Sequence, residues 1–424
     1  MGRPFLCTLP LEITQAILCH LPDLETLQST VFAHPALSSA FTEHKEYILH
    51  QILSHTIPPE LLPDAILAFN ASTIEADPWT RERVLSILDE HKSRQIPPSF
   101  RLTVKTAFSM QTLHRQVHAF TSEFLSTALS QMFFIGFPSS VSPSYTEECR
   151  TARSFYRFEI HQHLFRMREP RAGFNKPSPD FRLAEQWNIH YRHYPVWEVE
   201  QLMSVCDFLF RTIARPFREI AERETEWSDE GIWYVSGEAC HMDRPSPIGT
   251  LLAHGLVFLG RVLAAPTYAE RYQLLAPKLL GKPFISSLAE LLPNICGAQP
   301  GSALWYNDLT LEQIQGLQEV EPPGFDSGPA EAWRWAHARL ARYDWVGGED
   351  TQQLRRRGYV FWDHDRLVDW GLLDQPWRAL SPDLTTTEWR SEMMEANLEQ
   401  RPNLYLVRGV GWWWAGGHDP RPVS

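Results

Sequence analysis

The sequence has few cysteines, and their spacing excludes two kinds of small stabilised domain. There are six in 424 residues, and none of them forms a Cys-x-x-Cys pair. Zinc ribbons need that pair, and a disulfide framework needs many cysteines in a short chain. The cysteines therefore predict reduced thiols inside a cell.

Long hydrophobic runs are also missing. The most apolar stretch, 248–260, contains His254 and is followed by Arg261. A membrane-spanning helix needs about 18 or more apolar residues in a row. Glu12 interrupts the apolar run near the N-terminus, where a secretory signal would be continuous. We expect an intracellular protein of the cytoplasm, the nucleus or both, with no membrane partner.

The chain has fewer positively charged than negatively charged side chains. Lys and Arg number 39 against 51 Asp and Glu, which gives a net charge of −12. A general nucleic-acid binder or a binder of anionic membranes needs a cationic face, so we expect neither partner. The short basic run 355–357 is read as a solvated helix face or as an ion-pair partner of Glu349 and Asp350.

Strand-like alternation with Asn-Gly or Asp-Gly turns is nearly absent, whereas helical spacing is common. Apolar residues recur every three or four positions over 104–134 and again over 196–227, where Pro216 should kink the helix or break it in two. Eleven of the sixteen tryptophans lie at or after Trp305. We predict a mainly α fold whose larger, irregular helical part is rich in Trp.

Motifs of nucleophilic and phosphate chemistry are missing. There is no Gly-x-Ser-x-Gly, and Pro283 follows Gly281-Lys282 where a P-loop needs Ser or Thr. His114 and His118 lie one helical turn apart, but the motif HRQVH lacks the glutamate of His-Glu-x-x-His. These residues predict no enzyme, no cofactor and no metal.

Acidic residues do not form a predicted acid–base site either. Asp363 is expected to cap a helix, because three consecutive side chains of a helix or strand cannot converge on one point. The pairs Glu147/Glu148 and Glu198/Glu200 are read as solvated helix faces. We therefore expect no catalytic carboxylate.

The strongest local pattern lies near the N-terminus, from Thr8 to about Leu53. It predicts three short helices: one opened by Leu9-Pro10 and ended by Pro22, a second capped by Asp23, and a third that begins at Pro35 and extends through Ile52. A unit of about 45 residues is too small to bury all its apolar groups. Some of them should face a partner.

This segment resembles a known family. LP-x-EI-x-x-x-IL-x-x-LP-x-x-x-x-L, from Leu9 to Leu27, is similar to the F-box, the helical module that docks on the Skp-type adaptor of cullin–RING ubiquitin ligases. Many F-boxes have a tryptophan before the third helix, and this chain has Phe32-Ala33-His34-Pro35 there.

Further patches resemble a large group of fungal F-box-like proteins of unassigned function. They are spread along the whole chain and include His34-Pro35-x-Leu37-x-x-x-Phe41, 57–63, 155–159, 197–202, 356–363 and 411–413. That group supplies no agreed substrate or catalytic residue.

The resemblance implies a module of residues 1–95 that binds the adaptor and a helical body of residues 96–424 that recognises an unknown protein substrate. The chain would then be a non-catalytic substrate receptor of a Skp–cullin–F-box ubiquitin ligase. The alternative is an interaction or scaffold protein in which the same helices form a purely structural bundle. The residues expected to contact the adaptor are Leu9, Pro10, Leu11, Ile13, Ile17, Leu18, Leu21, Pro22, Leu24 and Leu27.

Overall fold

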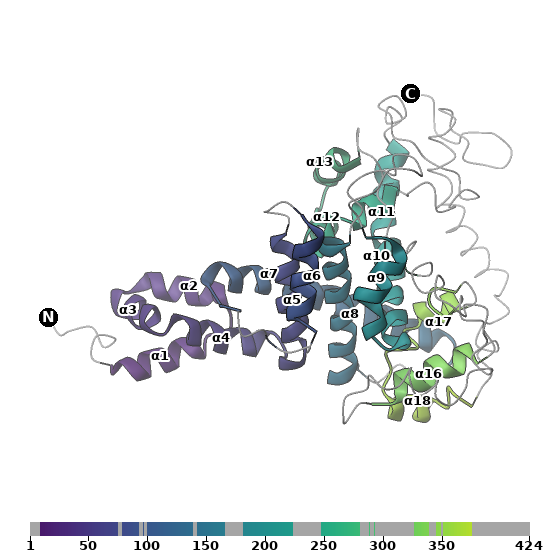
Figure 1. Ribbon diagram of the computed structural model, residues 1–424, viewed down its shortest axis with the longest axis horizontal. Helices are drawn as coiled ribbons and strands as arrows, with labels where there is room; N and C mark the ends of the chain where they lie inside the picture. The colour runs from purple at the N-terminus through teal and green to yellow at the C-terminus, as the bar shows by residue number, and fades with distance from the viewer. Residues whose placement is uncertain are drawn as a thin grey trace. The chain divides into compact units, whose positions relative to one another are not determined.

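The computed structural model is helical throughout the part of the chain that it describes (Figure 1). The described residues are 9–74, 79–92, 96, 100–138, 142–165, 181–223, 247–279, 288, 292, 326–338, 345–348 and 351–374. The prediction of a mainly α fold is confirmed, since these residues form helices and contain no strand. None of the helices described is long and apolar enough to span a membrane.

Contacts divide the chain into two compact units, residues 1–119 and 120–424. The division falls inside the long helix α7 (Val104–Phe134), whose start and end are those predicted from the sequence. The boundary expected from the sequence lies after residue 95, whereas the contacts assign the first half of α7 to the N-terminal unit.

The first unit consists of short helices followed by the start of α7. They are α1 (Leu11–Cys19), α2 (Leu24–Ala33), α3 (Pro35–Glu43), α4 (Lys45–Thr56), the 3₁₀ helix η2 (Pro59–Leu61), α5 (Leu62–Thr73) and α6 (Arg81–Glu90). Asp23 caps α2 as predicted, because its Oδ1 accepts a hydrogen bond from the Thr26 amide at 2.7 Å. Pro35 occupies the first turn of α3, where its missing N–H has no intrahelical partner to lose.

The predicted third helix is two helices in the structure. The chain leaves helical geometry at His44, which has φ −127° and ψ 37°, between α3 and α4. The residues 42–46 are all polar, so the apolar stripe that would hold one straight helix against the core is interrupted there. Ile48 and Ile52 are nevertheless buried as expected, from α4.

The second unit contains the rest of α7 and the remaining helices described. They are α8 (Tyr145–Leu164), α9 (Leu183–Ile189), the 3₁₀ helix η3 (Tyr191–His193), α10 (Val196–Arg223), α11 (Pro247–Leu252), α12 (Gly255–Ala264), α13 (Tyr268–Leu279), α16 (Gly328–His337), α17 (Gln352–Arg356) and α18 (His364–Trp370). Helix α10 contacts α8, α11, α12, α13, α16 and α17 and is the central element.

Aromatic rings fill the core of this unit. The Phe124 ring meets the rings of Phe208 and Phe361 edge-on, with centroids 5.5 and 5.0 Å apart, and Phe155 lies 6.4 Å away. Edge-to-face contacts at these distances are favourable beyond the area they bury. The four rings bring α7, α8, α10 and the segment before α18 into one core.

Of the kink or break expected at Pro216, the break does not occur, because α10 is a single helix from Val196 to Arg223. A proline removes one backbone hydrogen bond and crowds the preceding turn. Ile213, Ala214 and Phe217 are all buried around it. Packing on these neighbours offsets the loss, so tertiary contacts override the local signal.

Candidate functional site

The outer face of α1 carries exposed apolar side chains. Successive helical residues are rotated by about 100°, so residues four apart share a face. Thr14 and Leu18 form the buried side, at 4% and 0% exposure, whereas Ile13 and Ile17 point outward at 50% and 43%. The helix therefore has one apolar stripe in the core and a second one directed at solvent.

The ten residues predicted to contact an adaptor fall into three groups. Three are buried, two are half-buried and five are exposed. Buried are Leu18, Leu24 and Leu27; half-buried are Leu9 and Leu21; exposed are Pro10, Leu11, Ile13, Ile17 and Pro22. The buried leucines supply the core against which α1 and α2 pack, and the exposed residues remain accessible to another molecule.

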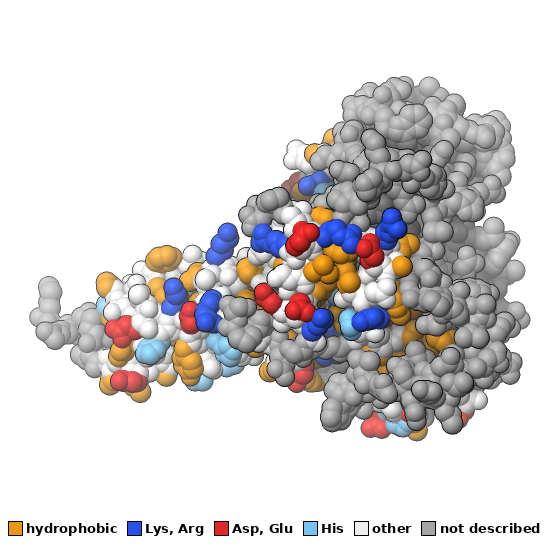
Figure 2. Space-filling model, viewed as in Figure 1, with side chains coloured by type: hydrophobic (Ala, Val, Ile, Leu, Met, Phe, Trp, Pro, Cys, Tyr) orange, Lys and Arg blue, Asp and Glu red, His pale blue; other side chains and the backbone are white. Residues whose placement is uncertain are grey.

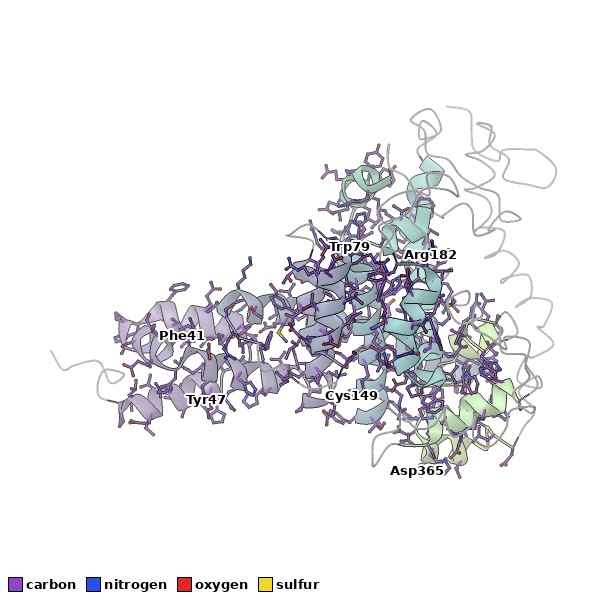
Figure 3. All side chains as sticks on the ribbon, in the orientation of Figure 1. Phe41, Tyr47, Trp79, Cys149, Arg182 and Asp365 are labelled. Atoms are coloured by element: carbon purple, nitrogen blue, oxygen red, sulfur yellow. The ribbon has the colours of Figure 1, made fainter. Side chains whose placement is uncertain are left out.

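Two exposed aromatic residues lie on other helices of the first unit. Phe32, in the last turn of α2, is 80% exposed, and Tyr47 in α4 is 58% exposed. Figure 2 shows hydrophobic side chains at the surface of α1–α4, and Figure 3 labels Tyr47 on α4. The sequence did not lead us to predict that Tyr47 is exposed. The available signal was its position directly before Ile48 and Leu49, whose side chains face the core.

The N-terminal end of α2 is anchored by α7 within the first unit. The amide of Leu24 donates to Gln111 Oε1 at 2.9 Å. The Glu25 carboxylate accepts hydrogen bonds from Gln111 and from the guanidinium of Arg115. The hydrogen bond from Arg115 is the main cause that lowers the pKa of Glu25 below its usual value. These polar groups hold α2 in place.

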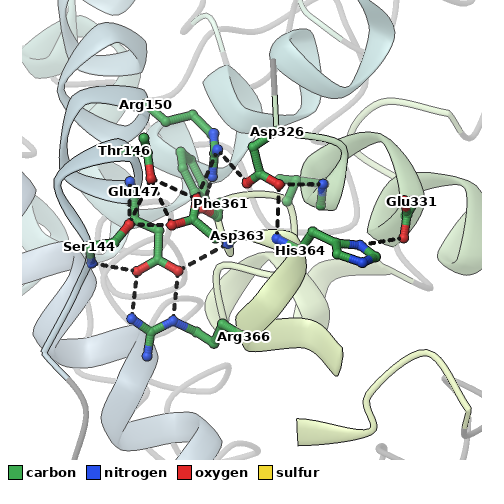
Figure 4. A network of polar contacts seen from close by, with 12 residues as sticks. Ser144, Thr146, Glu147, Arg150, Asp326, Glu331, Phe361, Asp363, His364 and Arg366 are labelled. Atoms are coloured by element: carbon green, nitrogen blue, oxygen red, sulfur yellow. Dashed lines mark hydrogen bonds and ion pairs between the residues drawn. The ribbon is translucent and has the colours of Figure 1, made fainter. Parts of the chain in front are cut away.

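An extensive polar network lies in the second unit and joins α8 to α18 (Figure 4). Glu147 is fully buried, and its two oxygens accept hydrogen bonds from Arg366 at 2.6 and 2.7 Å. The amides of Ser144 and Asp363 donate to the same carboxylate at 2.8 and 3.0 Å. The prediction that Glu147 is solvated is wrong; only Glu148 is exposed.

Asp363 precedes α18, but its carboxylate does not cap that helix as predicted. It accepts hydrogen bonds from Ser144 and Thr146 and pairs with Arg150 at 3.1 Å. Burial raises the pKa of Asp363, but these hydrogen bonds and the Arg150 charge outweigh it and keep the pKa low. Asp326 binds the first amide of α18 instead, with its Oδ1 3.0 Å from the His364 nitrogen.

A second buried network lies between α10 and α17. Arg355 donates to Asp207 at 2.6 Å and contacts Glu200 at 3.4 Å, and Tyr359 donates to Glu200 at 3.2 Å. Burial raises the pKa of Glu200 although Arg355 opposes this shift. The solvated faces predicted for Glu198/Glu200 and for the 355–357 run are therefore wrong, since Glu198, Glu200, Arg355 and Arg357 are buried. The alternative reading of that run, an ion pair with Glu349 and Asp350, lies outside the described residues.

The two networks hold structure together. Each buried carboxylate is tied to an arginine and to backbone or hydroxyl donors, which is the arrangement that makes a buried charge tolerable. Figure 4 shows that the bonds of the first network connect α8, α18 and the segment at Asp326.

The histidine pair of α7 does not gather further metal ligands in the described residues. The rings of His114 and His118 are tilted, with centroids 6.5 Å apart. No group of three His, Cys, Asp or Glu able to hold a metal occurs in the part of the chain that the structure describes. Burial lowers the pKa of His114 to about 4, so the ring is neutral near pH 7.

The exposed apolar face of α1, with Ile13 and Ile17, is therefore the candidate site. Comparison with known proteins adds no relative: no family model, curated protein or solved structure matches this chain.

Proposed function

We propose that the chain is a non-catalytic substrate receptor of a Skp–cullin–F-box ubiquitin ligase. Its first helices bind the Skp-type adaptor, and its helical body binds a protein substrate. The observation that carries this proposal is the outward position of Ile13 and Ile17 on α1. Both residues belong to the sequence pattern that resembles the F-box.

The physical argument is the cost of leaving these side chains in water. Burying a large aliphatic side chain stabilises an assembly by about 1.5–3 kcal/mol. A helix that carries apolar residues on the side away from its own core gains this free energy only by binding something else. Leu18, Leu24 and Leu27 fix the helices, so the surface is formed before a partner arrives.

The proposed mechanism is proximity. The receptor holds its substrate near a ubiquitin-charged enzyme and makes or breaks no bond itself. Positioning the two reactants is enough to accelerate the transfer, because it removes much of the entropic barrier. This requires only two binding surfaces on one chain.

The test is recovery of a Skp-type adaptor with the full-length chain. In the variant Ile13→Ser/Ile17→Ser, recovery should fall at least about tenfold, because two apolar contacts are lost. The matched control is Leu85→Ser/Ile96→Ser, which changes side chains of 42% and 44% exposure elsewhere in the first unit and should leave recovery unchanged. Equal losses in both variants, or no recovery of the adaptor by the unaltered chain, would refute the proposal.

The second candidate is an interaction or scaffold protein whose F-box-like helices are purely structural. One observation favours it: Gln111 and Arg115 of α7 bind the start of α2, so this bundle is integrated with the chain that follows it. The two candidates predict different effects of the adaptor on α1: slower amide exchange if the adaptor binds there, and unchanged exchange if the bundle is purely structural. Hydrogen exchange measures this difference.

A further inference from the structure

A pair of histidine rings lies where α1 and α4 end. His20 directly follows α1 and His55 is in the last turn of α4, and their rings are nearly parallel, with 9° between the planes and 6.3 Å between the centroids. Both side chains are exposed, and Figure 2 shows histidine side chains at the surface over α1 and α4. The two residues are 35 positions apart, so no sequence motif marks them.

The core of the first unit fixes the backbone beneath both rings. Leu18 of α1 and Ile52 of α4 are fully buried, and the two helices contact each other. The amide of His20 donates to the carbonyls of Ala16 and Ile17 at 3.3 and 3.2 Å. The two histidines therefore lie close together before any ligand arrives, and binding requires little rearrangement of the chain.

Other histidines of these helices already have hydrogen bonds. His34 Nδ1 accepts a backbone amide hydrogen at the start of α3, and His50 Nδ1 lies 3.4 Å from a serine hydroxyl of α4. The ring nitrogens of His20 and His55, in contrast, make no hydrogen bond within the part of the chain that the structure describes. Their lone pairs are available to a ligand from solvent.

We propose that His20 and His55 together bind one zinc ion. Zinc binds imidazole nitrogens at about 2.0–2.1 Å, so two imidazoles on one ion place their ring centroids about 5–6.5 Å apart. The observed 6.3 Å lies in this range. Rotation of an exposed ring about its last side-chain bond, whose preferred angles are broad, turns one nitrogen of each ring toward a shared ion. Imidazole is a ligand that suits zinc and its neighbours copper and nickel.

The pair supplies two of the four ligands that zinc usually takes. No third His, Cys, Asp or Glu joins it among the described residues. Positions that the protein leaves open on a zinc ion are filled by water or by another molecule. His20 follows Ile13 and Ile17 at helical steps of four and three residues, so the ion lies at one end of the exposed face of α1. This inference does not require that the face binds an adaptor.

Titration calorimetry on the metal-free, full-length chain tests the inference, with zinc chloride as the probe. Magnesium chloride is the comparison and should not bind at this site, because magnesium prefers oxygen ligands. His20→Gln/His55→Gln should bind one zinc ion fewer per chain, or bind it at least about tenfold more weakly. His20→Gln alone should lose the same site, because the second contact to the ion provides most of its affinity.

A matched control changes two histidines that are not paired with each other. His44→Gln/His50→Gln removes exposed imidazoles from the same part of the first unit and should leave this zinc site unchanged. Zinc bound weakly elsewhere is then the same in both double variants.

Hydrogen exchange on the unaltered chain locates the ion without any substitution. Zinc joins the end of α1 to the end of α4, so amide exchange should slow at both ends. Magnesium at the same concentration should leave it unchanged.

Four results would overturn the inference. They are the absence of zinc binding at millimolar concentration, equal zinc binding by the unaltered chain and by His20→Gln/His55→Gln, equal losses in the two double variants, and unchanged exchange at the ends of α1 and α4 when zinc is saturating.

Discussion

Glu147 and Glu148 are adjacent in α8, yet they lie in opposite surroundings. Glu147 is fully buried and paired with Arg366, whereas Glu148 is exposed. In Glu147→Gln, the guanidinium is left buried without its counter-charge, which should lower the free energy of unfolding by about 3–5 kcal/mol.

The neighbouring change, Glu148→Gln, is the matched control. It removes only an exposed charge from the first turn of the helix and should cost less than about 1 kcal/mol. Urea denaturation followed by tryptophan fluorescence measures both variants. Similar midpoints for the two would contradict the assignment of Glu147 to a buried ion pair.

These buried charges are the residue-scale feature that the sequence could not predict. Glu147 and Arg366 are 219 positions apart, and Glu200 and Arg355 are 155 apart. A charged residue is solvated unless a partner meets it in the core, and local pattern contains no information about so distant a partner. Without that information, Glu147 and Glu200 are read from the sequence as solvated, although both are buried.

At the scale of elements, the junction of α8 and α12 depends on a glycine. Gly255 has φ +80°, and a Cβ there would lie 2.7 Å from Glu159 Oε1. The same carboxylate accepts the Leu256 amide at 2.7 Å and so caps the start of α12. Gly255→Ala should lower the stability of the folded chain for two reasons: it strains the backbone, and its methyl group displaces this carboxylate.

Gly136→Ala separates the two effects. Gly136 also has positive φ, +99°, but no atom beyond its chain neighbours lies within 4 Å of the position that an alanine methyl group would take, so only strain of about 1–2 kcal/mol applies. Thermal unfolding should show a larger drop in midpoint for Gly255→Ala than for Gly136→Ala. Equal drops would mean that the contact with Glu159 contributes nothing.

Elements fixed by local chemistry were predicted, and elements fixed by packing were not. The ends of α7, the Asp23 cap and the Pro35 start follow from periodicity, capping and proline geometry. The break at His44 and the continuity of α10 through Pro216 depend on which side chains the core can hold.

At the scale of the whole molecule, a sequence pattern identifies apolar helix faces but not which of them the core covers. Leu18 and Ile17 are neighbours in the same pattern, and one is buried while the other is 43% exposed. Five of the ten predicted adaptor contacts are exposed and three are buried, and three-dimensional packing alone makes this division.

Hydrogen exchange on the full-length chain separates the two functions that remain for the first helices. If α1 binds the adaptor, amides of Leu11–Cys19 should exchange more slowly when the adaptor is added, because the outer stripe becomes covered. The start of α2 should change less, since Gln111 and Arg115 already hold it in the free chain. In Ile13→Ser/Ile17→Ser the slowing should disappear, whereas Leu85→Ser/Ile96→Ser should retain it. Unchanged exchange in α1 at saturating adaptor would instead mean that the bundle is structural and that its apolar outer face has another occupant.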